Sequence, residues 1–282
     1  MKHSIRETRT DRAAFNQLAR LHSATKDLCF DTVDLDFSLC PWFDANMAAP
    51  LGAVLARITA EMNEVRVLSP AAGIQKILSK NEFLKQYQFD PVSDNYGTVV
   101  PYRRFQLSED RYFTEYVQQF THGKGIPTMA PALRRKFHEG IGELFANAMM
   151  HSESRLGVFS CGQYYPQRKC FVFCIADAGS GFVGSIRRAF ELEVDSLKAM
   201  RFCLGQSNTT KRTEPGGLGL KLLKRFIELN RGRLVIVSNQ AYYEFSGCGE
   251  KFENLEQPFP GTCVNIEIDT ADSRNYRLTS EP

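Results

Sequence analysis

A polar stripe inside an apolar segment is the feature that most limits what this chain can fold into. Glu143, Asn147 and His151 recur at intervals of four, and Leu, Phe, Ala, Ala, Met and Met fill the positions between them. On an α-helix this spacing places a carboxylate, an amide and an imidazole on one face, while the other faces can be buried. We therefore expect a helix with one face suited to a metal ion and phosphates.

The first of two glycine-rich segments follows an apolar run, residues 170–176, which we interpret as a strand. The segment reads Asp177-Ala178-Gly179-Ser180-Gly181. Its glycines allow the backbone to approach a flat ligand closely, and the Asp177 carboxylate can accept a hydrogen bond from an exocyclic amine. Taken alone, a pattern of this kind is more often an ordinary turn.

The second glycine-rich segment reads Pro215-Gly216-Gly217-Leu218-Gly219-Leu220 and precedes a helix expected over residues 221–229. Exposed N–H groups at a helix start, together with the helix dipole, favour an anion such as a polyphosphate. A flexible loop that caps a helix is the alternative interpretation. A strand is expected over residues 233–238, after Gly232. With the polar stripe, the two segments predict a nucleotide pocket.

Charge and composition narrow the class of partner. The 35 basic and 32 acidic residues leave a net charge of +3, which gives no support to nucleic-acid binding. No apolar run approaches the length of a membrane span, and the charged N-terminus is unlike a signal peptide. The eight cysteines include no C-x-x-C pair, which favours buried free thiols over a disulfide framework or a zinc site. We expect a cytoplasmic protein, and 282 residues suggest two domains.

The N-terminal part alternates predicted strands and helices. Alternating apolar and polar residues predict strands over residues 32–38 and 63–69, and helical periodicity predicts helices over 45–62 and 71–87. Because Pro50 falls early in the first helix, we expect the regular helix to begin there. The order strand, helix, strand, helix predicts an α/β unit with a parallel strand pair.

This order, with the turn Phe43-Asp44-Ala45-Asn46 and the strand end Leu68-Ser69-Pro70, resembles a STAS domain, the fold of bacterial anti-sigma-factor antagonists. That family usually offers a phosphorylatable serine soon after the aspartate, where Ala45 and Asn46 stand here, so the resemblance does not extend to phosphorylation at this turn. A generic α/β packing domain is the alternative. A short helix is expected over residues 112–120, and the breakers in 121–127 place the domain boundary between residues 1–122 and 123–282.

Residues 131–269 resemble the GHKL ATPase superfamily, which includes gyrase and MutL ATPase domains, histidine kinases and anti-sigma-factor kinases. The stripe matches its N box, and Asp177, Gly179 and Gly181 match its first glycine box. The second glycine box matches at residues 217–220, and Gly261-Thr262, before a strand expected over 263–268, matches the Gly-Thr that closes the pocket floor. The resemblance implies a C-terminal two-layer α/β sandwich after the STAS-like α/β domain. Pro215 departs from the pattern, because a further glycine often stands there.

The resemblance also implies roles around a magnesium-bound ATP. Asn147 would hold the magnesium, Glu143 would position or deprotonate an attacking water or hydroxyl group as the catalytic residue, and Asp177 would bind the adenine amine. Residues 184–214 would form a lid, from which Lys211 would reach the γ-phosphate, although a surface charge is the simpler interpretation of Lys211 alone. His151 can equally be a cap or a packed residue. The implied ATP-contacting residues are Asn147, His151, Asp177, Gly179, Gly181, Thr210, Lys211, Gly216, Gly217, Leu218, Gly219, Leu220 and Thr262.

These features favour a cytoplasmic signalling ATPase, or a serine/threonine kinase-like switch of the anti-sigma type, whose N-terminal domain is a built-in module for a regulatory protein partner. A histidine-kinase-like protein is one alternative, but neither His122 nor His138 stands on a separate dimerisation helix. A module that binds ATP without hydrolysis is another alternative. No nucleic-acid or membrane partner is expected, and a homodimer is compatible with the sequence.

Overall fold

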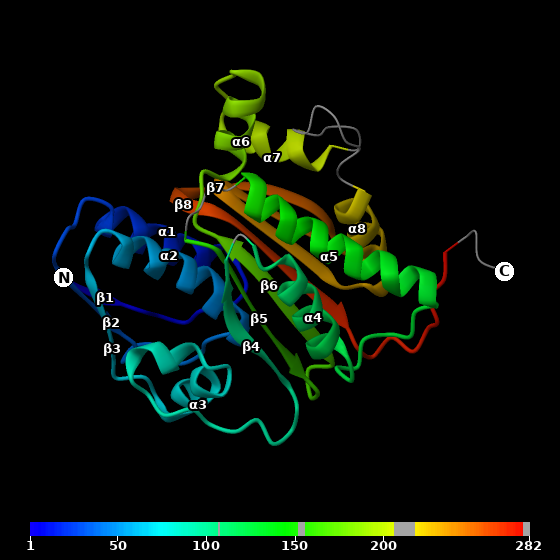
Figure 1. The fold of residues 1–282 in the computed structure, drawn as a ribbon, viewed down its shortest axis with the longest axis horizontal. Helices are drawn as coiled ribbons and strands as arrows, with labels where there is room; N and C mark the ends of the chain where they lie inside the picture. Colours follow the sequence, from blue (N-terminus) through cyan, green and yellow to red (C-terminus); the bar gives the residue numbers. More distant parts are fainter. Residues whose placement is uncertain (107, 152–155, 206–217, 279–282) are drawn as a thin grey trace.

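Two β-sheets of opposite type organise the chain (Figure 1). The computed structural model describes residues 1–106, 108–151, 156–205 and 218–278, without the side chains of Met150, His151, Leu218 and Gly219. The N-terminal residues form a three-stranded parallel sheet, and later residues form a five-stranded antiparallel sheet. The mixed α/β class expected from the sequence is therefore confirmed.

The N-terminal unit alternates strands and helices, and its sheet has the order β1-β2-β3. Val33 and Leu35 of β2 lie opposite Val65 and Val67 of β3 in parallel register, which confirms the expected strand pair. A first strand and helix, β1 and α1, add to what the sequence pattern predicts. The elements are β1 (Lys2–Ser4), α1 (Arg12–Thr25), β2 (Thr32–Asp36), η1 (Ala45–Met47), α2 (Ala48–Ala60) and β3 (Glu64–Leu68).

The single helix expected over residues 71–87 is wrong, because the chain breaks after α3 (Ala72–Lys80). Glu82 adopts a left-handed backbone conformation, with φ of 67°. The Asn81 side-chain oxygen accepts a hydrogen bond from the Phe83 N–H at 3.0 Å, which starts the separate 3-10 helix η2 (Phe83–Tyr87). Asparagine competes well with helical hydrogen bonding in this way, and helical periodicity alone does not reveal it.

The start of α2 also differs from the expectation. The segment begins as the 3-10 turn η1 and becomes regular at Ala48, two residues before Pro50. Pro50 lies in the first turn of α2, where backbone N–H groups have no partner within the helix and proline therefore costs no hydrogen bond. The helix consequently starts earlier than the proline suggests.

The antiparallel sheet has the strand order β4-β5-β6-β8-β7. β7 and β8 form a long hairpin that extends past the strands expected at residues 233–238 and 263–268. Gly261 and Thr262 therefore lie inside β8, not before a strand. The strands are β4 (Val99–Phe105), β5 (Val158–Tyr165), β6 (Cys170–Asp177), β7 (Arg233–Ser246) and β8 (Gly249–Asp269).

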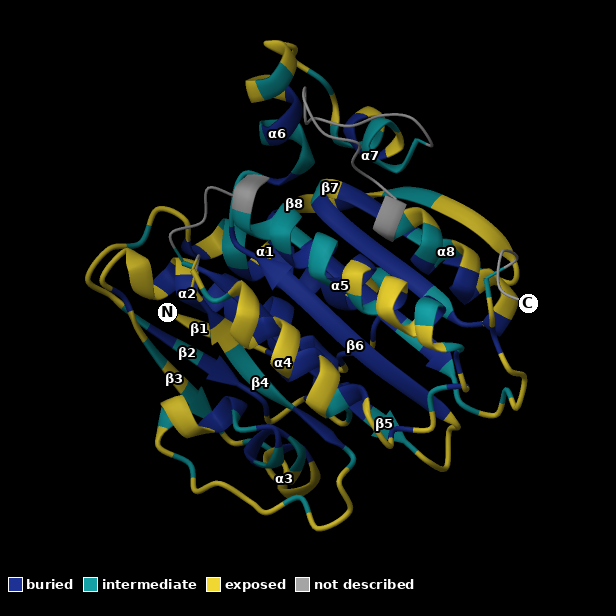
Figure 2. Cartoon of the chain, turned by 45° about the vertical axis from the view of Figure 1, so that its right-hand side comes forward, coloured by how far each residue is buried: buried dark blue, intermediate teal, exposed yellow. Residues whose placement is uncertain are grey.

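Helices cover both faces of this sheet, and every residue of β6 is buried (Figure 2). Phe171, Phe173 and Ile175 share a core with α4 (Asp110–Thr121), α5 (Pro131–His151) and α8 (Leu218–Asn230). Cys161, Cys174 and Cys263 share a second core with α1 and α2 on the opposite face. Two further helices, α6 (Gly181–Phe190) and α7 (Ser196–Leu204), lie beyond the end of β6 (Figure 1).

The short helix expected before the proposed domain boundary is the central part of α4. Both β4 and α4 precede residue 123, yet β4 pairs with β5 and α4 packs against α5. The segment after η2 therefore belongs structurally to the antiparallel sheet. The division into residues 1–122 and 123–282 stays a prediction about domains.

All eight cysteines are free thiols, and five of them are buried. Cys174 and Cys263 approach each other most closely, with their sulfur atoms 3.5 Å apart on adjacent strands. Among the helices in the described part of the chain, none is both long and apolar enough to cross a membrane.

Candidate functional site

The end of β6 brings a buried carboxylate together with two hydroxyls from within β7 and β8. Asp177 ends β6 with 2% of its surface exposed, and its Oδ1 accepts a hydrogen bond from the Gly179 N–H at 2.8 Å. The backbone N–H of Thr262 on β8 also donates to this carboxyl group. Burial raises the Asp177 pKa to about 7, although these two hydrogen bonds act to lower it.

A glycine allows the backbone to come this close to the carboxylate. Gly261 has a φ of +79°, a left-handed conformation that glycine adopts without strain. A Cβ at this position would collide with the Asp177 carbonyl and carboxyl oxygens and with the Gly179 nitrogen. Gly261, which precedes Thr262 in the Gly-Thr pair, is therefore a packing requirement of the Asp177 turn.

The first turn of α6 is held by β7. The Phe182 N–H donates to Ser238 Oγ at 2.8 Å, and the Val183 N–H donates to Asn239 Oδ1 at 3.2 Å. Ser238 Oγ also lies 2.9 Å from Thr262 Oγ1, with a hydrogen bond between the two hydroxyls. These side chains satisfy N–H groups that a helix start leaves without a helical partner.

Ser238 and Asn239 are site residues that the sequence reasoning missed. They follow the apolar run of β7 as a polar pair, and this change from apolar to polar residues is the sequence signal that could have identified them. Asn239 has a positive φ of 53° next to a register shift against β8, so its side chain departs from regular strand alternation. Its amide also donates to the Ser180 carbonyl at 3.1 Å, and it thereby fixes the turn between Gly179 and Gly181.

The polar stripe lies on α5, which packs against both β6 and α6. Phe145 stacks on Phe113 of α4 with ring centroids 4.0 Å apart, and Phe137 contacts Phe226 of α8 at 5.3 Å; α5 lies between α4 and α8 (Figure 2). At about 100° per residue, Glu143 and Asn147 fall on the α8 side of the helix. Both side chains are half-buried.

The remaining expected residues divide into those that α8 carries and those outside the described residues. Leu218 opens α8 and Gly219 follows it, whereas the Leu220 side chain packs against the hydrophobic core. Leu220 is therefore a half-buried residue of the first turn of α8 that packs against the core. Thr210, Lys211, Gly216 and Gly217 lie outside the described residues, and His151 is described only as the last residue of α5.

The arrangement therefore has two described parts at one end of the antiparallel sheet (Figure 1). One is the buried Asp177 carboxyl, with Thr262 and Ser238 beside it. The other is the flank of α5 with a carboxylate and an amide, which are the oxygen ligands that magnesium prefers. The Asp177 carboxyl can accept a hydrogen bond from one end of a polar ligand. The side-chain oxygens of Glu143 and Asn147 can hold a metal ion at its other end.

No protein-family model, curated protein or solved structure matches this chain.

Proposed function

We propose that this chain binds ATP with magnesium at the end of the antiparallel sheet where β6, β8 and α5 meet. The observation that carries the proposal is Asp177, a buried carboxyl group at a strand end that accepts hydrogen bonds from two backbone N–H groups. Such a group is an acceptor of fixed direction, and an adenine amine is a donor of matching chemistry. The resemblance of the three sequence segments to the GHKL superfamily supports the same assignment.

Each residue would do a different part of the work. Asp177 would select the base, and Asn147 would supply an oxygen ligand to magnesium, which neutralises phosphate charge when bound. Glu143 would orient or deprotonate an attacking water or hydroxyl group. The start of α8 would face the phosphates with its N–H groups and the positive end of its dipole. The overall activity would be that of a regulatory ATPase or an anti-sigma-type protein kinase.

The deciding experiment is calorimetric titration of the whole chain with ATP, with and without magnesium. A ligand at 100 times its Kd stabilises the folded state by about 2.7 kcal/mol, so ATP with magnesium should also raise the melting temperature. Asn147→Ala should remove most of the magnesium-dependent part of binding. Gln119→Ala, an exposed amide on α4, is the matched control and should bind as the wild type does.

Absence of ATP binding by the folded wild-type protein would refute the pocket assignment. Equal loss of binding in Asn147→Ala with and without magnesium would assign Asn147 to the fold of α5 and not to the metal.

A further inference from the structure

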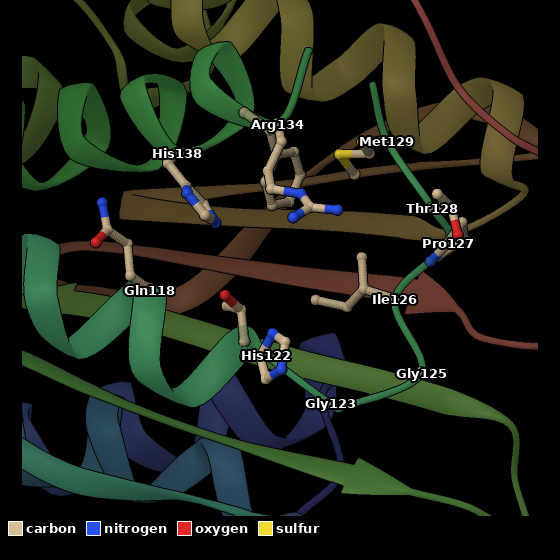
Figure 3. A pocket seen from close by; sticks show the side chains of 12 residues that line it. Gln118, His122, Gly123, Gly125, Ile126, Pro127, Thr128, Met129, Arg134 and His138 are labelled. Carbon is tan, nitrogen blue, oxygen red and sulfur yellow. The ribbon is translucent and has the colours of Figure 1, made fainter. Parts of the chain in front are cut away.

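A cavity lies beside the first turns of α5, away from the flank that carries Glu143 and Asn147 (Figure 3). It has a volume of about 340 Å³ and opens between the last turn of α4, the first two turns of α5 and the connecting segment. Arg134 and His138 enter it from α5, and Gln118 and His122 enter it from the end of α4 (Figure 3). Its volume is at the lower end of the range for small-molecule sites.

The cavity gathers basic groups and has no carboxylate among its lining residues. Arg134 and His138 are four residues apart, so they share one face of α5. Glu139 is turned about 100° away from His138 around the helix. On α4, the exposed Glu115 pairs with Arg111 at 3.0 Å. The nearby acids on these two helices therefore do not neutralise the cavity.

The pKa of His138 reflects this excess of basic groups. Burial lowers the His138 pKa, and the positive charge of Arg134 lowers it further. Within the described residues Arg134 forms no salt bridge. The same positive charge that lowers the His138 pKa would attract an anion that enters the cavity.

We propose that this cavity is a binding site for a small oxyanion ligand, a molecule that carries a phosphate or carboxylate group. The Arg134 guanidinium offers a planar fork that matches either group, and the two imidazoles add hydrogen-bond donors when protonated. Gln118 adds a neutral amide donor. Ile126, Met129 and Phe137 form an apolar wall against which the carbon skeleton of such a ligand can pack. The site is independent of the proposed nucleotide site.

Histidine NMR tests the proposal residue by residue, because the chain has only five histidines. The imidazole signals, assigned with His→Gln variants, are titrated with pH in sodium phosphate, in sodium citrate and in sodium chloride of equal ionic strength. A bound oxyanion should raise the proton affinity of His138 about tenfold, a rise of about 1 in its pKa, and the His122 signal should also move. A response to phosphate alone identifies a phosphate ligand, and a response to citrate alone identifies a carboxylate. His3 and His22, which lie in β1 and α1, are internal controls.

Two matched arginines provide the second measurement. Arg134→Gln should weaken binding of the effective anion at least about tenfold, because it removes a charge-assisted hydrogen bond. Arg135→Gln removes the same charge from the neighbouring exposed position, which does not line the cavity, and should change binding less than twofold.

Three results would overturn the proposal. Equal shifts of all histidines in phosphate or citrate would indicate a general salt effect. Equal losses in the two arginine variants would indicate surface charge and not a site. Loss of the response in Asn147→Ala, with retention in Arg134→Gln, would assign the anion to the nucleotide site, so failure here is distinguishable from failure of the proposed function.

Discussion

Replacement of Asp177 by asparagine should make the protein more stable at alkaline pH. The Asp177 pKa is about 7 in the folded protein, against an ordinary value of 3.8. The folded state therefore holds this proton more tightly than the unfolded state does. The stability that this proton confers is fully present below pH 3.8 and is lost as the pH rises through about 7.

The size of the effect follows from the difference in pKa. A difference of about 3 corresponds to a cost of about 4 kcal/mol for the ionised carboxylate at pH 8, at 1.36 kcal/mol for each pKa unit. The asparagine side chain is neutral, keeps an acceptor for the Gly179 N–H, and loses one hydrogen bond worth about 1 kcal/mol. Asp177→Asn should consequently be about 3 kcal/mol more stable than wild type at pH 8, and within about 1 kcal/mol of it at pH 5.

Urea denaturation of both proteins at pH 5 and pH 8, followed by circular dichroism, measures this difference. Asp36→Asn is the control, because a hydrogen bond from Lys2 lowers the Asp36 pKa to about 2. That carboxylate is ionised in both states at pH 5 and pH 8, so its replacement should destabilise the protein equally at the two pH values. Wild-type stability that does not fall between pH 5 and 8, or an Asp177→Asn protein no more stable than wild type at pH 8, would refute the reasoning.

Three further predictions follow from the same region. Gly261→Ala should destabilise the fold by roughly 3 kcal/mol in the same denaturation assay, because the added Cβ would meet backbone atoms at a residue with positive φ. Gly247→Ala is the control: it has open space around it and should change stability by under about 0.5 kcal/mol. Glu143→Ala should keep ATP affinity within a few fold and abolish hydrolysis or phosphotransfer in a radiolabel assay. Glu139→Ala, an exposed residue one turn earlier on α5, is the control. Loss of ATP binding in a folded Glu143→Ala protein would assign Glu143 a structural role. In competition binding at pH 8, ATP should be preferred over GTP by at least about tenfold, because the guanine carbonyl would meet the Asp177 carboxylate acceptor to acceptor, and Asp177→Asn should reduce that preference; equal wild-type affinities would remove Asp177 from a base-binding role.

Periodicity predicted the long regular elements because one face of each is buried. The apolar run expected as a strand over residues 170–176 is an example, because β6 spans Cys170–Asp177. Periodicity does not predict breaks made by single side chains. Asn81 ends a helix pattern by binding the Phe83 N–H, although the apolar residues continue on both sides of it.

Part of the candidate site, like part of the fold, was predictable from the sequence. Asp177 and Thr262 stand out in sequence beside glycines, and the structure places them in contact through the Thr262 N–H. Ser238 and Asn239 have no glycine beside them, and their role depends on a strand pairing that brings β7 to α6. Contacts between segments more than 50 residues apart are set by the topology of the sheet, which local sequence patterns do not specify.

The buried contact between the N-terminal unit and the antiparallel sheet limits the role that the N-terminal unit can have. Phe15 of α1 contacts Phe259 and Tyr242 of the β7–β8 hairpin, with ring centroids 5.9 and 6.3 Å apart. Asn46 of η1, just before α2, is fully buried, and its side-chain amide donates to Asn265 Oδ1 of β8 at 2.8 Å. A module that binds and releases would expose this apolar face each time, and obligate interfaces are the ones built as a continuous core. The N-terminal unit is therefore a fixed layer of this fold, so any regulatory protein partner would bind surfaces outside this shared core.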